Sequence, residues 1–156
     1  SCNQTLITMN EIKENKEVKY SVKKERNAVK PSNAFIAASW TALIAGVTAY
    51  FVGLWNAEML LSEKGYYFII LLFGLFSVVS VQKSVRDKLE GIPVTEIYYG
   101  LSWFCTITAI VLLVIGLWNA ELTLSEKGFY AMSYVLGMFS AIAVQKNTRD
   151  MKLADQ

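Results

Sequence analysis

Residues 53–87 read GLWNAEMLLSEKGYYFIILLFGLFSVVSVQKSVRD, and residues 116–150 read GLWNAELTLSEKGFYAMSYVLGMFSAIAVQKNTRD. The two stretches align without a gap at an offset of 63, and 20 of the 35 positions are identical. The identities gather in GLWNAE, LSEKG and QK-x-x-RD, at the ends of apolar runs whose interiors share only their hydrophobicity. Because a duplication of this length indicates a repeated structural unit, we predict two copies of a helix, a short turn and a second helix.

Four long gaps in the charge pattern indicate the class of protein. Asp, Glu, Lys and Arg are absent from residues 31–57, 65–82, 97–120 and 128–145. These stretches are 27, 18, 24 and 18 residues long, and a helix needs about 20 apolar residues, within a range of roughly 17–25, to cross a bilayer. A helix of a soluble bundle would instead carry a polar stripe along one side. The sequence therefore predicts an all-α, polytopic membrane protein with four transmembrane helices.

The four spans divide evenly between the two copies. They are predicted at residues 34–55, 66–82, 97–118 and 129–145. Because each copy crosses the membrane twice, both enter it from the same side, as parallel repeats related by a pseudo-two-fold axis along the membrane normal. The predicted segments are a polar N-terminal tail at 1–33, a first two-helix repeat at 34–87, a loop at 88–96, a second two-helix repeat at 97–150 and a C-terminal tail at 151–156.

Lysine and arginine predict the orientation. Residues 1–33 carry seven of them, residues 83–96 carry three and residues 146–156 carry three, whereas the other two connections hold one each, Lys64 and Lys127. Positive charge collects on the cytoplasmic side, so both termini and the middle loop are predicted to be cytoplasmic. The N-terminal tail mixes basic and acidic residues with few large apolar ones, and we expect it to be mostly disordered or to lie on the cytoplasmic surface.

Composition gives no sign of metal, redox or nucleic-acid chemistry. The chain has no histidine and a net charge of only +2. Cys105 falls inside the third span, where a thiol acts as a small apolar packing residue, and Cys2 lies in the tail without a CxxC partner. We therefore predict no catalytic residue, cofactor or metal site and no nucleic-acid partner. The sequence begins with Ser1 rather than Met, and Met9 is an alternative start of the protein.

Each copy carries the same polar turn between its spans. Its residues are Trp55, Asn56, Glu58, Ser62, Glu63, Lys64 and Gly65, repeated as Trp118, Asn119, Glu121, Ser125, Glu126, Lys127 and Gly128. The tryptophans, with Tyr66-Tyr67 and Phe129-Tyr130, are predicted to anchor in the headgroup region.

Capping is the favoured interpretation of the polar residues in these turns. Asn ends the incoming helix, and Ser62 and Ser125 are expected to be N-caps of the outgoing helices. Glu63 and Glu126 would then sit in the first turn, where the helix dipole favours a carboxylate. The alternative is a small cation or ligand site, formed where the carboxylates of the two turns meet at the pseudo-two-fold axis.

A second polar motif marks the inner end of each repeat. It consists of Gln82, Lys83, Arg86 and Asp87, repeated as Gln145, Lys146, Arg149 and Asp150. Lys and Asp at i and i+4 face one another if the helix continues beyond the membrane. The basic side chains suit anionic headgroups, so membrane anchoring is favoured over a specific lipid or protein partner.

Small residues predict where helices approach one another closely. Ala34, Ala38, Ala42 and Gly46 share one face of the first span, and Gly74 and Gly137 are matched positions in the second and fourth spans. Such faces are usually helix–helix interfaces. No span has an ionisable residue near its centre, and such residues are the usual feature of ion pathways and proton relays.

The duplicated GLWNAE-x-x-LSEKG-[YF]-Y … QK-x-x-RD pattern, with KLEGIP between the copies, resembles the YiaAB two-helix-domain family over residues 34–150. The resemblance implies a multipass bacterial inner-membrane protein built of two-helix units, and it brings no established activity, catalytic residue or cofactor. Our leading hypothesis is a non-enzymatic structural or interaction module. Its partners would be the lipid bilayer and either further copies of itself or other membrane proteins. The alternative is a small transporter or channel that uses the outer carboxylates, and an enzyme ranks third.

Overall fold

The computed structural model describes residues 2–155, in which all regular secondary structure is helical. The helices are α1 (Cys2–Val29), α2 (Asn33–Asn56), α3 (Leu61–Leu89), α4 (Glu96–Asn119) and α5 (Leu124–Ala154). Four of them, α2 to α5, contain stretches long and apolar enough to cross a membrane. The predicted all-α class and the four predicted spans are therefore confirmed.

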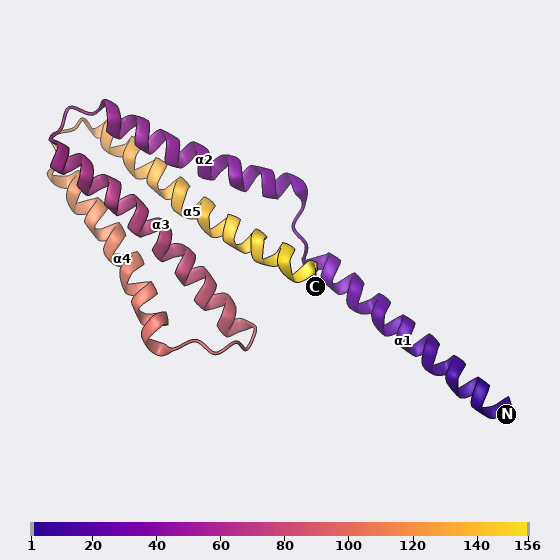
Figure 1. Ribbon diagram of the computed structural model, residues 1–156. Coiled ribbons are helices and arrows are strands. Elements are labelled where there is room, and N and C mark those ends of the chain that lie inside the picture. Colours follow the sequence, from indigo (N-terminus) through magenta and orange to yellow (C-terminus); the bar gives the residue numbers. More distant parts are fainter. Residues whose placement is uncertain (1, 156) are drawn as a thin grey trace. The chain divides into compact units, whose positions relative to one another are not determined.

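The described residues form two compact units. Residues 33–146 contain α2, α3, α4 and most of α5 and are called the bundle from here on. Within the bundle, α2 lies alongside α5, and α3 lies alongside α4 (Figure 1). The other unit contains α1 and the last turns of α5, which line a shallow hollow with the basic side chains of Lys19, Lys23 and Arg26.

The N-terminal tail is helical, so the prediction that it is mostly disordered was wrong. Helix α1 has 28 residues and buries none of them. Its sequence has neither Gly nor Pro and is rich in Lys and Glu, which are good helix formers. The helix ends just before Pro31, because a proline disfavours the helical conformation of the preceding residue. Local propensity therefore builds this helix without a buried face.

Helices α3 and α5 extend beyond the spans that were predicted for them. Helix α3 covers Leu61–Leu89 rather than residues 66–82, and α5 covers Leu124–Ala154 rather than residues 129–145. Charged residues limit how much of a helix can lie in hydrocarbon, but Glu, Lys, Gln and Arg continue a helix readily in water. The predicted limits were therefore limits of the apolar segment and not of the helix.

A Schellman motif ends α3 at Gly91, two residues before Pro93. Gly91 has a φ of +73°, a backbone conformation that glycine adopts without steric cost. The backbone N–H of Ile92 donates to the Asp87 carbonyl at 2.8 Å, and that of Gly91 donates to the Lys88 carbonyl at 3.2 Å. Thr95 then caps the start of α4 with its side chain. This short connection reverses the chain between α3 and α4.

Helix pairing in the bundle crosses between the two repeats. A Cβ added at Gly53 of α2 would lie 2.8 Å from the ring of Phe129 of α5. A Cβ added at Gly116 of α4 would lie 2.7 Å from the ring of Tyr66 of α3. The two contacts are related by the 63-residue offset, since 53 and 116 correspond, as do 66 and 129. Each repeat therefore packs its first helix against the second helix of the other repeat.

Tyrosines fill the core between α3 and α5. The rings of Tyr67 and Tyr130, which are equivalent positions of the two repeats, stack with centroids 6.0 Å apart and planes 18° apart. The hydroxyl of Tyr50 donates to the Tyr67 carbonyl at 2.7 Å, and that of Tyr134 donates to the Ile70 carbonyl at 3.1 Å. These bonds join neighbouring helices through the backbone and satisfy polar groups that lipid cannot.

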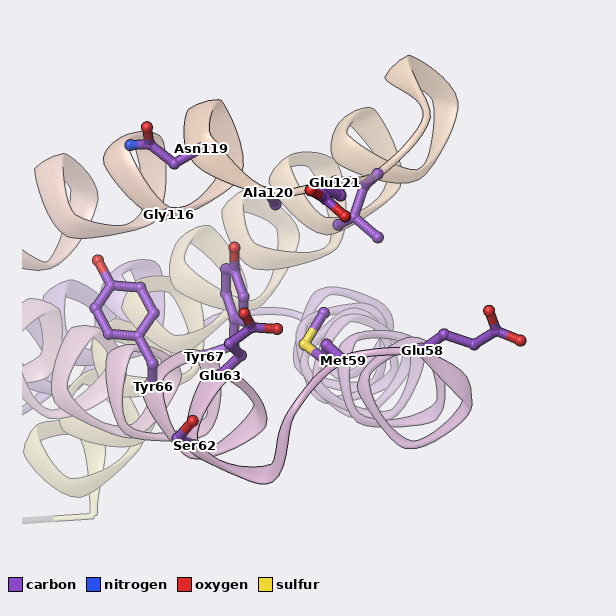
Figure 2. A pocket seen from close by; sticks show the side chains of 11 residues that line it. Glu58, Met59, Ser62, Glu63, Tyr66, Tyr67, Gly116, Asn119, Ala120 and Glu121 are labelled. Atoms are coloured by element: carbon purple, nitrogen blue, oxygen red, sulfur yellow. The ribbon is translucent and has the colours of Figure 1, made fainter.

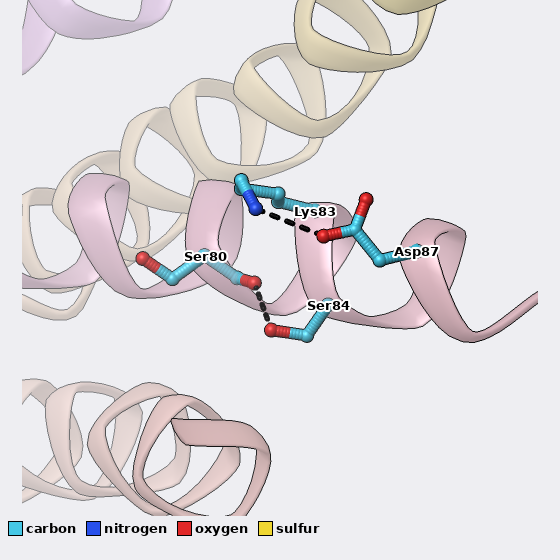
Figure 3. A network of polar contacts seen from close by, with 4 residues as sticks. All are labelled: Ser80, Lys83, Ser84 and Asp87. Carbon is cyan, nitrogen blue, oxygen red and sulfur yellow. Dashed lines mark hydrogen bonds and ion pairs between the residues drawn. The ribbon is translucent and has the colours of Figure 1, made fainter. Parts of the chain in front are cut away.

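Serine and threonine side chains inside the bundle bond to their own helices. Ser77 donates to the Phe73 carbonyl at 2.6 Å, and Ser84 donates to the Ser80 carbonyl at 2.8 Å (Figure 3). This bond to the carbonyl four residues earlier lets a hydroxyl be buried without a partner on another helix. Small polar residues therefore permit close packing here without requiring water.

Along the small-residue face of α2, a close contact is formed at Gly46, in the C-terminal half of the helix. Gly46 is buried, and a Cβ added there would lie 2.8 Å from the backbone nitrogen of Gly137. Ala34 and Ala38, by contrast, are exposed. The predicted close approach of helices is therefore confirmed at Gly46, and for the exposed Ala34 and Ala38 it stays a prediction.

Candidate functional site

The two repeated turns lie at the same end of the bundle and line shared cavities. We call residues 56–63 and 119–126 together the turn end. Helix α2 ends at Asn56 and α4 ends at Asn119, as predicted. The side-chain amide of each donates to the carbonyl four residues earlier, at 2.9 Å in both cases. The nearby Trp55 and Trp118 side chains are 84% and 82% exposed, as expected for rings in a headgroup region.

The predicted N-caps lie two residues too late in the sequence. Helix α3 begins at Leu61 and α5 at Leu124, so Ser62 and Ser125 are already helical and Leu60 and Thr123 take the cap positions. The hydroxyl of Thr123 accepts from the Glu126 backbone N–H at 3.3 Å. The Leu60 side chain has no oxygen that could accept such a hydrogen bond. The capping rules therefore favoured Ser62 over Leu60 as the N-cap.

Glu63 and Lys64 stabilise the helix ends at the first turn. A carboxylate oxygen of Glu63 accepts from the Leu60 backbone N–H at 3.2 Å. The ammonium of Lys64 donates to the Trp55 carbonyl at 3.2 Å, where the negative end of the α2 dipole favours a cation. The predicted first-turn positions of Glu63 and Glu126 are confirmed. Gly65 and Gly128 have no atoms within 4 Å of an added Cβ, so packing does not require glycine there.

Two cavities open at the turn end. The first cavity has a volume of about 550 Å³ and is lined by Glu58, Glu63, Tyr67, Gly116, Asn119 and Glu121, among others (Figure 2). The second cavity has a volume of about 740 Å³ and is lined by Glu121, Glu126, Tyr130, Gly53, Asn56 and Glu58, among others. Each of the six residues named for one cavity corresponds, at the 63-residue offset, to one named for the other. The cavities are therefore two copies of one site that share Glu58 and Glu121.

The four carboxylates of the turn end come to one end of the bundle without forming a metal-ligand set. Glu58, Glu63, Glu121 and Glu126 are all exposed. Glu58 points away from the other two labelled carboxylates (Figure 2). Among residues 2–155, no three His, Cys, Asp or Glu side chains are placed to hold one metal ion. The geometry therefore favours capping over direct coordination of a metal.

Sequence reasoning missed two tyrosines, Tyr67 and Tyr130, that line these cavities. Tyr67 and Tyr130 were predicted to anchor in the headgroup region, but each is only 4% exposed. Their neighbours Tyr66 and Phe129 do reach the surface in part. The sequence held one sign of their importance. Tyr67 and Tyr130 are identical at equivalent positions of the two repeats, whereas the residues on either side of them differ between the repeats.

Near the C-terminal end of α3, the first copy of the second polar motif forms the predicted ion pair. The ammonium of Lys83 lies 2.8 Å from a carboxylate oxygen of Asp87, four residues later (Figure 3). Arg86 pairs in the same way with Glu90, at 2.6 Å, a contact that was not predicted. Gln82 is partly buried, and one side-chain oxygen lacks a hydrogen-bond partner among residues 2–155.

The second copy of this motif is divided between the two units. Gln145 and Lys146 belong to the bundle, while Arg149 and Asp150 belong to the other unit. All four lie within α5, as expected if the helix continues beyond the apolar span.

Replacing Glu63 by glutamine is expected to lower the free energy of unfolding by less than ~1 kcal/mol, because it removes a charge from a helix N-terminus. Glu126→Gln is expected to cost less, since the Thr123 hydroxyl already caps α5. Unfolding by sodium dodecyl sulfate in mixed micelles would measure both. A larger loss at Glu126 than at Glu63 would contradict the capping assignment.

Four membrane-length helices, arranged as two copies of a two-helix unit with matching turns, define a duplicated multipass helical membrane protein. The chain belongs to the yiaA/B two helix domain family, which matches it at residues 35–87 and again at residues 98–150. The resemblance noted from the turn and inner-end motifs is thereby confirmed.

Two curated proteins illustrate the range of this family. The inner membrane protein YiaA of Escherichia coli strain K12 is 58% identical over 119 residues, which are 76% of this chain and 82% of that protein. The uncharacterized membrane protein YubF of Bacillus subtilis strain 168 is 35% identical over 68 residues, which are 43% of this chain and 74% of that protein. No solved structure matches the chain significantly.

Proposed function

We propose that this chain is a multipass protein of the bacterial inner membrane that acts as a non-enzymatic packing and interaction module. The similarity to a protein named for the inner membrane supports the location. The crossed pairing of helices between the repeats supports the role. In this role the chain performs no chemical step, and its two-helix units provide surfaces for other membrane helices.

The crossed pairing carries the proposal, because a two-helix unit by itself lacks the helix against which its own helix packs. Gly53 of the first repeat receives Phe129 of the second, and Gly116 of the second receives Tyr66 of the first. A pseudo-two-fold axis along the membrane normal would pass near the stacked rings of Tyr67 and Tyr130. A surface shaped for a two-helix unit also suits units from another chain. We propose further copies and related family members as partners.

The test is to cut the connection between α3 and α4 after the protein has folded. A protease site replaces residues between Glu90 and Thr95 of the full chain, and the cleaved protein is passed over a sizing column in mild detergent. The two fragments are expected to elute together and to separate only in denaturing detergent. Fragments that separate in mild detergent would contradict crossed pairing and with it the proposed role.

The proposed orientation places both termini inside and both turns outside. Thirteen of the fifteen basic residues would then be cytoplasmic. In a cysteine-free background, Ser62→Cys and Ser125→Cys are expected to react with a membrane-impermeant maleimide in intact spheroplasts. Leu89→Cys, which is also exposed, is expected to react only after lysis. Labelling of Leu89→Cys in intact spheroplasts would reverse the orientation.

A further inference from the structure

An open groove lies between α2 and α3 where the two helices approach the first turn. It has a volume of about 760 Å³ and is lined by Phe51, Leu54, Trp55, Lys64, Gly65 and Phe68, among others. None of its lining residues belongs to either cavity of the turn end. The groove is therefore a separate feature of the surface, and one with a different chemical character.

Two phenylalanines form an apolar wall of the groove within the membrane-spanning part of the bundle. Phe51 of α2 and Phe68 of α3 contact one another, with ring centroids 5.5 Å apart. Both lie inside the stretches of sequence that carry no charge, and Phe68 is 41% exposed. An exposed ring at this depth faces the hydrocarbon of the bilayer or an apolar ligand. The wall therefore suits a chain of methylene groups.

Lys64 places a positive charge at the end of the groove nearest the turn. Its side chain is half-buried, and its ammonium donates to the Trp55 carbonyl at 3.2 Å. An ammonium has three N–H donors, so this bond leaves two for a ligand. No Asp or Glu lines the groove among the described residues, whereas carboxylates line both cavities of the turn end. The charge of the groove therefore favours an anion.

Glycine at position 65 keeps the groove open beside this lysine. Gly65 lines the groove, and a Cβ added there would meet no atom within 4 Å. Packing inside the chain therefore does not explain the absence of a side chain. A larger residue at this position would extend into the space of the groove.

The second repeat keeps the charge of the groove but not its apolar wall. At the 63-residue offset, the lysine and the glycine recur as Lys127 and Gly128, whereas the two phenylalanines are replaced by Val114 and Ala131. These smaller side chains offer less apolar surface to a bound chain. The second repeat therefore supplies a matched control at every position that carries the argument.

We propose that the groove between α2 and α3 binds one phospholipid with an anionic headgroup. An acyl chain lies against Phe51 and Phe68, and the phosphate accepts hydrogen bonds from the Lys64 ammonium. A cation beside an apolar wall matches a molecule with a negative head and an apolar tail. An apolar transmembrane helix in the groove would leave the ammonium without a counter-charge. The site does not rest on the proposed packing role, which concerns the crossed pairs α2–α5 and α3–α4.

Native mass spectrometry of the full chain tests the headgroup contact. Delipidated protein in detergent is titrated with phosphatidylglycerol, and the wild type is expected to bind a first molecule more tightly than any later one. Lys64→Gln is expected to weaken this first binding about tenfold, as for loss of a hydrogen bond to a charged group. Lys127→Gln removes the equivalent charge of the second repeat and should leave the first binding unchanged.

A second variant tests the groove itself. Gly65→Leu fills the space beside Lys64 without meeting another atom of the chain at its Cβ, and it raises helix propensity. The protein should therefore fold as the wild type does and lose its tightly bound lipid. Gly128→Leu is the matched control, because its Cβ also meets no atom within 4 Å, and it should retain the lipid.

Four results would overturn the proposal. They are the absence of a tightly bound lipid on the wild type, equal weakening by Lys64→Gln and Lys127→Gln, unchanged affinity in Gly65→Leu, and equally tight binding of phosphatidylcholine with the same acyl chains. The last of these would remove the anionic headgroup from the assignment. A dimer of the wild type that Gly65→Leu dissociates would instead make the groove an interface between copies of the chain.

Discussion

Replacing Gly46 by leucine is expected to destabilise the bundle by more than ~3 kcal/mol, the upper range for overpacking a tight contact. A Cβ added there would lie 2.8 Å from the backbone nitrogen of Gly137 and 3.1 Å from the Ser133 carbonyl oxygen. Because both neighbours are backbone atoms of α5, no side-chain rotation can make room. The helices α2 and α5 would have to separate along their length. Unfolding in mixed micelles and retention on a sizing column would measure the loss.

Gly100→Leu is the matched control for this prediction. Gly100 lies in α4, which also has membrane-spanning length, but an added Cβ meets no atom within 4 Å. Leucine at this position should stabilise the helix slightly through its higher propensity. Equal losses from Gly46→Leu and Gly100→Leu would mean that the α2–α5 contact is not a structural requirement.

The class of fold could be predicted from the sequence alone, because the hydrocarbon core of a bilayer excludes charged side chains from the helices that cross it. Every membrane-spanning helix needs a long run without charge, and the runs at 31–57 and 97–120 coincide closely with α2 and α4. Helices α3 and α5 were predicted too short because charge ends the apolar segment and not the helix. Helix α1 was missed because a polar sequence without a buried face gives no periodic signal.

The site was predicted less well, because its decisive features depend on pairing between helices. The turn residues Asn56 and Glu63 could be assigned from local capping rules, and the structure agrees with both. Sequence cannot tell how the helices of the two repeats pair, so it could not predict that Glu58 and Glu121 line the same cavities. For the same reason it assigned Tyr67 to a lipid interface.

The tyrosine positions also explain why the two halves of the bundle are not identical. Tyr50 and Tyr134 donate hydrogen bonds to backbone carbonyls of α3. The residues that correspond to them at the 63-residue offset are Leu113 and Leu71, which have no hydroxyl. Equivalent positions of the two repeats therefore differ in their interhelical hydrogen bonds, although the turns between the spans are alike. This asymmetry gives equivalent glycines different surroundings.

Gly74→Ala and Gly137→Ala are accordingly expected to have opposite effects, although they are equivalent positions of the repeats. A Cβ at Gly74 would overlap the Tyr134 hydroxyl and lie 3.0 Å from Met138 Sδ. Tyr134 is only 1% exposed and has nowhere to move, so a loss of about 2–4 kcal/mol is expected from overpacking and from its hydrogen bond. A Cβ at Gly137 would meet only Val47, at 3.7 Å, and alanine there should stabilise the helix by up to ~1 kcal/mol.

Tyr134→Phe tests the cause of the loss at Gly74. Alone, this substitution should cost about 1 kcal/mol, because the hydrogen bond to the Ile70 carbonyl disappears. Combined with Gly74→Ala, it removes the overlapping oxygen, so the double variant should be more stable than the sum of the two single losses implies. The rescue is expected to be partial, since the ring carbon that carries the hydroxyl lies 3.0 Å from the added Cβ. Strict additivity in mixed-micelle unfolding would show that Gly74 does not act through Tyr134.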